Sequence, residues 1–252
     1  MFRAWPCLAK IRFVVRIRRT QINNKIIRTD PVRIGIVGGT GGMGGGFALR
    51  WSRDHEILVG SRDAGRASEA AARYAEAAGA AHGTSPSISG VTNEEAASAD
   101  VLVLSIPYGQ IDAVCPGVLE KAGPGCTVIS PIVPMKKTDT GFEFIPMADG
   151  LPPAHEAVSK HMRDPSMLVS AFHAVSEKKL EKIPREVRCD IFVCGDGKGS
   201  VDLVKGLVSE IPGLNPVYLG PGRLAYLAEM ATPLLLNAMI RGGPKNPGIS
   251  LS

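Results

Sequence analysis

VRIGIVGGTGGMG, residues 32–44, is the stretch of this 252-residue chain that decides its fold. Its first half, residues 32–37, is an apolar and largely β-branched run, typical of a buried parallel strand. Its second half carries the spacing Gly-x-Gly-x-x-Gly at Gly39, Gly41 and Gly44. Glycine lets the backbone approach a pyrophosphate, and free N–H groups at the start of the next helix hold the anion. The stretch predicts a strand, a phosphate-binding turn and a helix, in which Gly38, Thr40, Gly42 and Met43 complete the nucleotide-binding loop.

The glycine spacing alone is weak, because a chain with 29 glycines produces such matches by chance. Its surroundings make it specific. Residues 47–51 continue at helical density, and residues 55–60 read as a second strand, which completes a β-α-β unit within about 30 residues. A dinucleotide site is therefore favoured over a purely structural turn.

Strands and helices continue to alternate along the first half of the chain. We expect helices at 64–78, 93–99 and 111–122, the second started by Asn93, and strands at 88–91, 101–106 and 127–130. This order predicts an α/β fold, a Rossmann-type doubly wound parallel sheet.

The second half is expected to be a smaller α/β portion. Gly, Pro and Lys are frequent over residues 135–153, which suggests a long loop. Beyond it we expect strands at 167–172, 190–194 and 217–219 and helices at 199–210 and 222–240. The predicted organisation is a basic extension at 1–30, a Rossmann-type dinucleotide-binding domain at 31–150 and a C-terminal portion at 151–252 that either extends the same sheet or forms a separate domain.

Charge is distributed unevenly along the chain. The net charge is +5, but residues 1–30 alone carry +7 and the remainder about −2, so the body lacks the basic surface of a nucleic-acid binder. The first 30 residues are either an extension without a role in the chemistry, or a targeting segment or basic arm that touches a polyanion.

Composition also narrows the compartment and the chemistry. The five cysteines have no CxxC spacing, so neither a disulfide framework nor a metal site is expected. No apolar run reaches the roughly 18–20 residues that span a bilayer. We therefore expect a soluble, cytoplasmic protein with no membrane contact.

The end of the second strand predicts which nucleotide binds. An NAD site places Asp or Glu there, whereas this chain has Ser61 and Arg62, with Arg66 one helical turn later. Serine and arginine can hold a 2′-phosphate, which predicts NADP(H). The alternative is that Asp63 binds the ribose and both arginines are solvated.

Three further segments end at the same expected edge of the sheet, where ligands of open α/β sheets bind. They contribute Ile106, Pro107 and Tyr108, then Pro131 and Val133, and finally the run 171–175. These residues would wall the nicotinamide. His173 would be the titratable group beside it, although a lone histidine is often structural.

From Val32 to Leu251 the chain resembles the NADPH-dependent reductases of the deazaflavin coenzyme F-420 (also written F420), the F-420:NADP oxidoreductases. The resemblance is carried by GGTG at 38–41, VGSR at 59–62, NEEAA at 93–97, PIVP at 131–134, VSAFH at 169–173, VCGD at 193–196 and TPLLLN at 232–237. These motifs occur in order over both halves of the chain.

The resemblance implies that Thr40, Ser61, Arg62 and Arg66 bind the NADP phosphates. It places His173 and Val175 beside the nicotinamide and the deazaflavin ring, and it implies a homodimer in which the C-terminal portion completes the deazaflavin pocket. One departure concerns residues 108–110, Tyr-Gly-Gln, where many relatives have an aromatic residue followed by Glu-His.

The implied reaction is reversible hydride transfer between C4 of the nicotinamide and C5 of the deazaflavin. It needs no protein nucleophile or metal, so catalysis should be mostly positioning, with His173 orienting a ring or stabilising charge. Two alternatives remain: an NADPH-dependent imine or carbonyl reductase resembling pyrroline-5-carboxylate reductase, and a non-catalytic NADP(H) sensor.

Overall fold

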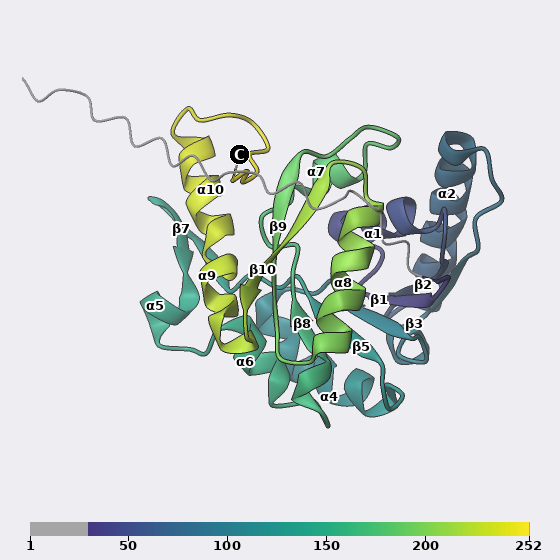
Figure 1. Ribbon diagram of the computed structural model, residues 1–252, viewed down its shortest axis with the longest axis horizontal. Helices are drawn as coiled ribbons and strands as arrows, with labels where there is room; N and C mark the ends of the chain where they lie inside the picture. The colour runs from purple at the N-terminus through teal and green to yellow at the C-terminus, as the bar shows by residue number, and fades with distance from the viewer. Residues whose placement is uncertain (1–29, 252) are drawn as a thin grey trace, which may run out of the picture.

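The computed structural model describes residues 30–251 (Figure 1). Predictions for the basic extension at 1–30 therefore fall almost wholly outside the described residues. The main feature is one eight-stranded sheet in the order β10-β9-β8-β5-β4-β1-β2-β3. Its strands are β1 (Arg33–Val37), β2 (Glu56–Ser61), β3 (Ile88–Thr92), β4 (Val101–Leu104), β5 (Thr127–Ser130), β8 (Leu168–Ser170), β9 (Cys189–Gly195) and β10 (Leu214–Gly220).

The sheet is mostly parallel, and the predicted doubly wound α/β fold is confirmed. All neighbouring strands from β8 to β3 pair in parallel, and β9 pairs with β10 in parallel. The strands predicted in the second half thus lie in the same sheet as those of the first half. The order reverses between β1 and β4, which defines a topological switch point.

One pair of strands departs from the predicted parallel arrangement, because β8 and β9 are antiparallel. The cause lies in the connection between them. A parallel return needs a crossover, usually a helix, across a sheet face, but this segment contains only the one-turn helix α7 (Glu177–Leu180). That helix contacts α1 and does not cross the sheet, so the chain re-enters in the opposite direction.

Helices cover both faces of the sheet, as Figure 1 shows. One face packs against α1 (Gly42–Trp51), α2 (Ala64–His82) and α8 (Lys198–Glu210); the other packs against α4 (Ile111–Lys121) and α6 (Ala154–Ser159). Strand residues alternate between the two cores, with Val101 and Val103 on the first and Leu102 and Leu104 on the second. This period of two is what a strand buried on both faces requires.

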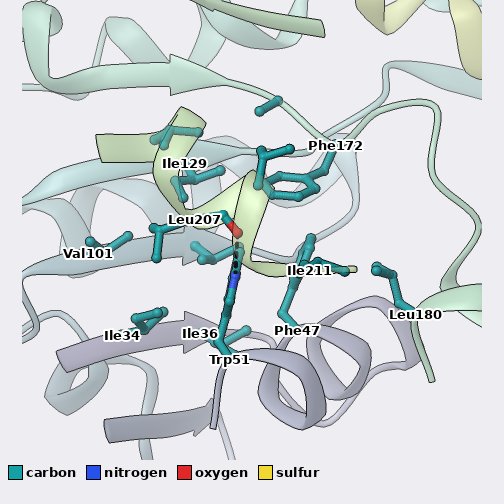
Figure 2. Packing of buried hydrophobic residues seen from close by; sticks show 14 of the residues in the cluster. Ile34, Ile36, Phe47, Trp51, Val101, Ile129, Phe172, Leu180, Leu207 and Ile211 are labelled. Atoms are coloured by element: carbon teal, nitrogen blue, oxygen red, sulfur yellow. Dashed lines mark hydrogen bonds between the residues drawn. The ribbon is translucent and has the colours of Figure 1, made fainter. Parts of the chain in front are cut away.

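The larger core is organised around aromatic side chains (Figure 2). Phe47 stacks on Trp51 with ring centroids 4.8 Å apart, and Phe172 meets both rings edge-on. The Trp51 indole N–H donates to the carbonyl oxygen of Leu207 at 2.9 Å. Helix α1 is thereby joined to α8 and to the loop that follows β8.

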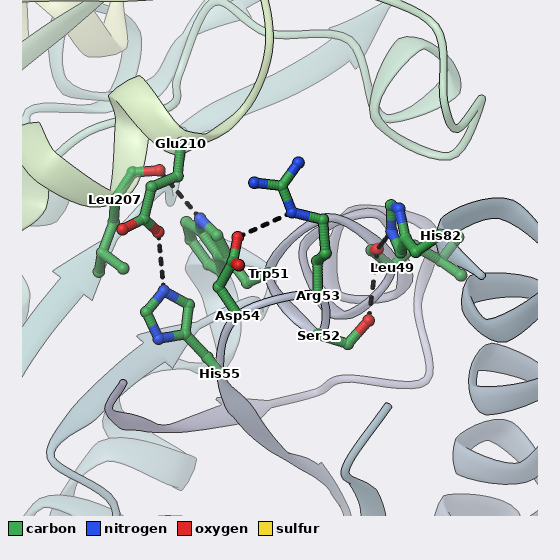
Figure 3. A network of polar contacts seen from close by, with 9 residues as sticks. All are labelled: Leu49, Trp51, Ser52, Arg53, Asp54, His55, His82, Leu207 and Glu210. Carbon is green, nitrogen blue, oxygen red and sulfur yellow. Dashed lines mark hydrogen bonds and ion pairs between the residues drawn. The ribbon is translucent and has the colours of Figure 1, made fainter. Parts of the chain in front are cut away.

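A second connection lies where β2 begins (Figure 3). His55 Nε2 is 2.7 Å from Glu210 Oε2, and both side chains are buried. The other ring nitrogen accepts the backbone N–H of Val32 at 3.2 Å. A buried polar pair loses its hydration, which offsets much of the stability that the contact adds. The contact between His55 and Glu210 therefore mainly fixes how α8 packs on β1 and β2.

Several predicted elements differ from the structure. The expected loop at 135–153 contains the hairpin β6 (Met135–Thr138) and β7 (Gly141–Phe144) and the helix α5 (Ile145–Asp149). Its polar, lysine-rich strands lack the apolar alternation that identifies strands in a sequence. The helix expected at 222–240 is divided into a 3-10 turn, α9 (Ala225–Glu229) and α10 (Ala231–Ile240).

The described chain also contains the short helix α3 (Asn93–Ala96) and 3-10 turns at Tyr108–Gln110 and Pro165–Met167. Helices α6 and α7 escaped prediction because helices of four to six residues carry almost no periodic signal. Between residues 30 and 251, no helix combines the length and apolarity needed to traverse a lipid bilayer.

Candidate functional site

The predicted site residues gather along the carboxyl edge of the parallel strands. The loops after β1, β2, β4, β5 and β8 all leave the sheet at this edge, on both sides of the switch point. A ligand crossing the switch point can therefore touch all five loops.

The glycine loop after β1 is a tight turn. Gly38 has a φ of 70°, and the backbone N–H of Gly39 donates to the carbonyl oxygen of Gly60 at 2.8 Å. A Cβ on Gly44 would lie 2.7 Å from the Cα of Gly39, so only glycine lets α1 approach the turn this closely. The loop is closed against β2 and leaves its outer side free.

Asn93 holds this loop, a role that the sequence analysis missed. Its Oδ1 accepts the N–H of Gly38 at 3.1 Å, and its side chain is buried. The expected cap of α3 is instead Thr92, which forms a capping box with Glu95. The order Thr-Asn-Glu-Glu after a short strand was the available signal, since Thr-x-x-Glu is itself a capping-box pattern.

The N-terminus of α1 has no side-chain cap, so its first N–H groups are open to an anion. Thr40, half-buried, and Gly41, exposed, precede the helix, and Gly42 and Met43 begin it. Glu177 lies beside this start: a Cβ on Gly42 would be 2.8 Å from its Oε2. Glu181 Oε1 would be 3.2 Å from the same Cβ, so two acidic side chains border the candidate anion site.

The loop after β2 leaves two arginines free to bind a phosphate. Arg62 and Arg66 are exposed, and neither forms an ion pair with any residue between 30 and 251. Asp63 is already engaged, because it caps α2 by accepting the Arg66 N–H at 2.9 Å. The Ser61 hydroxyl accepts the N–H of Asp63 at 3.2 Å.

The loops after β4 and β5 supply apolar surface. Ile106 and Pro131 are buried, Val133 is half-buried and Pro107 is exposed. The Tyr108 hydroxyl donates to the carbonyl oxygen of Pro152 at 2.7 Å. This bond joins the loop after β4 to the segment that precedes α6.

His173 is buried, and neither of its ring nitrogens has a hydrogen-bond partner among the described residues. Burial, assisted by the nearby His155, lowers the pKa of His173 to about 3, so the ring is neutral at physiological pH. An unpartnered buried imidazole is costly. Its two free nitrogens are therefore suited to a ligand that supplies the missing partner.

The backbone that presents His173 is itself constrained. Phe172 adopts a φ of 69° although it is not glycine, and its side chain is fully buried against Phe47 and Trp51. Such a conformation costs on the order of 1–3 kcal/mol and clusters at functional sites. The Thr232 hydroxyl also donates to the carbonyl oxygen of His173. Val175, two residues on, is buried in the same core.

A buried carboxyl group, Glu229, lies on the C-terminal side of the site. Its oxygens accept the backbone N–H groups of Ala154 and His155, each at 2.9 Å. Burial raises the pKa of Glu229 to about 7 despite these two bonds. Sequence reasoning did not single it out, because a glutamate in a helix is ordinarily exposed.

These features fit a dinucleotide phosphate better than an isolated structural turn. The glycine turn admits close backbone approach, the start of α1 is uncapped, and two arginines stand free after β2. A neutral, unpartnered imidazole follows β8. Fold and edge together define the class of nicotinamide-dinucleotide oxidoreductases with a Rossmann-type domain.

Comparison with known proteins narrows this class. Residues 33–134 match the family described as "NADP oxidoreductase coenzyme F420-dependent". An F420-dependent NADP reductase of Methanothermobacter thermautotrophicus is 32% identical over 232 residues, covering 90% of this chain and 97% of the relative. An F420-dependent NADP reductase of Methanocaldococcus jannaschii is also 32% identical, covering 88% of this chain and 98% of the relative. The chain belongs to the F420-dependent NADP reductase family.

Solved structures agree on the fold. A crystal structure from Arthrobacter sp. FB24, provisionally named an F420-dependent NADP reductase, superposes with a TM-score of 0.69 at 17% identity, over 88% of this chain and 99% of that one. Prephenate dehydrogenase from Aquifex aeolicus gives a TM-score of 0.52 at 14% identity, over 77% of this chain and 62% of that one.

Proposed function

We propose that this protein is an oxidoreductase that transfers hydride reversibly between NADP(H) and coenzyme F-420. Family membership over nine-tenths of the chain supports the pair of substrates. The observation that carries the proposal is the contrast along one sheet edge: free arginines follow β2, and an unpartnered buried imidazole follows β8.

The nucleotide lies across the switch point. The open N–H groups at the start of α1, together with Thr40, hold the pyrophosphate, and Ser61, Arg62 and Arg66 hold the 2′-phosphate. Gly38, Gly39, Gly41, Gly42, Met43 and Gly44 supply the backbone of this cradle. Arg62 and Arg66 form no ion pair with an acid within residues 30–251, which favours NADP(H) over NAD(H).

The apolar loops after β4 and β5 would hold the nicotinamide, with Ile106, Pro107, Tyr108, Pro131 and Val133 as its contacts. His173 and Val175 would contact the deazaflavin. The bound nicotinamide supplies the hydride chemistry. The protein's part is to hold the two rings in contact and exclude water, with His173 donating or accepting one hydrogen bond as a neutral ring.

The competing activity on this scaffold is an imine or carbonyl reductase. Such an enzyme needs a proton donor near its acceptor, and His173, with a pKa of about 3, is a poor donor at neutral pH. A neutral ring that orients a flat acceptor suits hydride transfer to a deazaflavin better. A nucleotide sensor would bind NADPH without oxidising it.

The deciding experiment mixes purified protein with NADPH and oxidised coenzyme F-420 and follows loss of the deazaflavin absorbance. Rapid bleaching with NADPH and slow bleaching with NADH is the expected result. Tight NADPH binding without bleaching would refute the proposal and favour the reductase of another acceptor or the sensor.

The assembly proposed is a homodimer that works in the cytoplasm. Five large apolar side chains are exposed on the C-terminal helices and on α5: Tyr226, Leu227, Leu234, Ile240 and Met147. Burying such side chains against a second copy removes apolar surface from water. Light scattering should give twice the monomer mass, and Leu234→Glu should give the monomer.

A further inference from the structure

We propose that Glu229 is a positioning residue for hydride transfer, which acts through His155 and the end of β8 on His173. The inference rests on the proposed function, in which His173 borders the reacting rings. It concerns the buried polar side chains of α6, β8 and α9 that the proposed nucleotide contacts do not use.

Glu229 joins two distant parts of the chain. It is the last residue of α9 and is fully buried, and its carboxylate binds the first two N–H groups of α6, about 75 positions earlier in the sequence. A buried carboxylate is a poor stabilising device, because desolvation offsets much of what its hydrogen bonds contribute. What it does fix is the place and the angle at which α6 begins.

The start of α6 determines where the His155 ring lies. His155 Nδ1 is 2.8 Å from the Ser170 hydroxyl, at the last residue of β8. Its Nε2 fills the space beside Gly222, where a Cβ would lie only 2.0 Å away. The His155 ring therefore lies between Ser170 at the end of β8 and the turn before α9. Ser170 is three residues before His173 in the sequence.

The same joint also holds His173 directly. Glu229 ends α9, and Thr232, three residues later in α10, donates its hydroxyl proton to the carbonyl oxygen of His173. The two residues lie on either side of the break at Met230. One short segment therefore holds both histidines, His155 through its backbone N–H and His173 through its backbone carbonyl.

Few nearby groups can compensate the negative charge of ionised Glu229. Of the groups that face it, His155 on α6 is held neutral because burial lowers its pKa, and the nearby Asp196 only partly counters this. Tyr108 and Cys194 have raised pKa values, chiefly from burial, to which the Glu229 charge adds. His155 in turn lowers the pKa of His173, in addition to the larger effect of burial. Among the described residues, no cation pairs with Glu229.

Two measurements test the inference. The first is the pH dependence of coenzyme F-420 reduction by NADPH in the wild type and in Glu229→Gln, whose amide can accept only one of the two N–H groups. We expect kcat to fall between about 10-fold and 100-fold with little change in KM for NADPH, and the inflection near neutral pH to disappear. The matched control is Glu156→Gln, an exposed glutamate on α6, the helix whose start Glu229 binds, and it should behave as the wild type.

The second measurement needs no substrate. Nitrogen-15 spectra of the histidine rings report the tautomer and titration of His155 and His173 in the free protein. Both should change in Glu229→Gln and stay as in the wild type in Glu156→Gln. A pure stability role would leave the ring spectra of the folded variant unchanged.

Ser170→Ala provides the second variant in case Glu229→Gln does not fold, because it removes the partner of His155 and leaves α6 anchored. It should change the His155 tautomer and lower kcat in the same direction. A folded Glu229→Gln protein with wild-type kcat, pH profile and ring spectra would overturn the inference, as would an unaltered Ser170→Ala protein if Glu229→Gln fails to fold. If the wild type does not reduce coenzyme F-420, the proposed function fails, and the ring spectra still decide the role of Glu229.

Discussion

The two ends of the candidate site are built in opposite ways. The nucleotide end consists of the loop after β1, the start of α1 and the loop after β2, where backbone N–H groups and the side chains of Arg62 and Arg66 are exposed. At the acceptor end, His173, His155 and Glu229 are buried and share few hydrogen bonds with one another. One end presents solvated charge, and the other presents desolvated, neutral or nearly neutral groups.

Because of this difference, we expect one end to determine nucleotide affinity and the other to determine turnover and its pH dependence. Exposed arginines change a binding constant without reorganising the core, whereas buried titratable groups respond to pH and to small displacements. Substitutions at the nucleotide end should therefore alter nucleotide selectivity and leave folding intact. Substitutions at the acceptor end should alter stability, turnover and pH dependence together.

The largest effect is expected at Phe172, which presents His173 from the core. Phe172→Ala removes two edge-on ring contacts and should lower the free energy of unfolding by about 3–5 kcal/mol. Urea unfolding measures this loss. Phe142→Ala, at a half-buried position in the β6–β7 hairpin, is the control and should cost less. A loss below about 1 kcal/mol for Phe172→Ala would contradict the view that the core positions the acceptor end.

The pH dependence of stability should come from the acceptor end. Glu229, with a folded pKa of about 7 against 4.5 normally, retains a proton that the unfolded chain has released. Its contribution is present below pH 4.5 and is lost as the pH rises through 7, about 3 kcal/mol in all. His173 has the opposite sign, since its contribution is full above pH 6.5 and is lost as the pH falls toward 3.

The two slopes oppose each other between pH 4.5 and 6.5. Unfolding experiments at several pH values should therefore show a steeper rise of stability with pH in Glu229→Gln than in the wild type, because the opposing contribution of Glu229 is removed and those of His173 and His155 remain. Parallel curves for the two proteins would show that Glu229 does not titrate in this range.

At the nucleotide end, Arg62→Ala should weaken NADPH binding by roughly 10-fold to 100-fold, the loss expected for a charge-assisted hydrogen bond of about 1.5–3 kcal/mol. Binding of NADH and the melting temperature should be unchanged. Titration calorimetry with both nucleotides measures the ratio. Arg53→Ala, an exposed arginine paired with Asp54, is the control. An unchanged NADPH-to-NADH ratio would assign the 2′-phosphate elsewhere.

The smallest effect is expected at Glu177, the nearer of the two acidic side chains beside the start of α1. Glu177→Gln removes a negative charge close to the anion site and should tighten NADPH binding by about 2-fold to 5-fold. The gain should fade at high salt. Weaker binding would instead mean that the Glu177 carboxylate accepts a hydrogen bond from the nucleotide. Glu186→Gln, on the same connection but paired with Arg188, serves as the control.

The nucleotide end was predictable from sequence because its signals are local. A β-branched strand, glycines at fixed spacing and Ser-Arg at the end of the next strand occupy one β-α-β unit, and the structure places them as one turn, one helix start and one loop. The five strands of the first half of the chain followed from the same alternation.

The acceptor end depends on contacts between distant segments, which no local pattern records. Glu229 binds α6, Thr232 binds His173, and Asn93 binds the glycine loop, each across dozens of residues. The reversal of β9 escaped for a related reason: strand direction depends on how the connection crosses the sheet, and a short α7 cannot be read from composition.

The contact between His155 and Gly222 has an evolutionary consequence. Since a Cβ at position 222 would lie 2.0 Å from the His155 ring, the two positions cannot enlarge independently. Histidine at 155 requires glycine at 222, and homologues with a small residue at 155 should tolerate a side chain at 222. The pair should therefore covary among homologues, and a double-mutant cycle in this chain should show strong coupling between them.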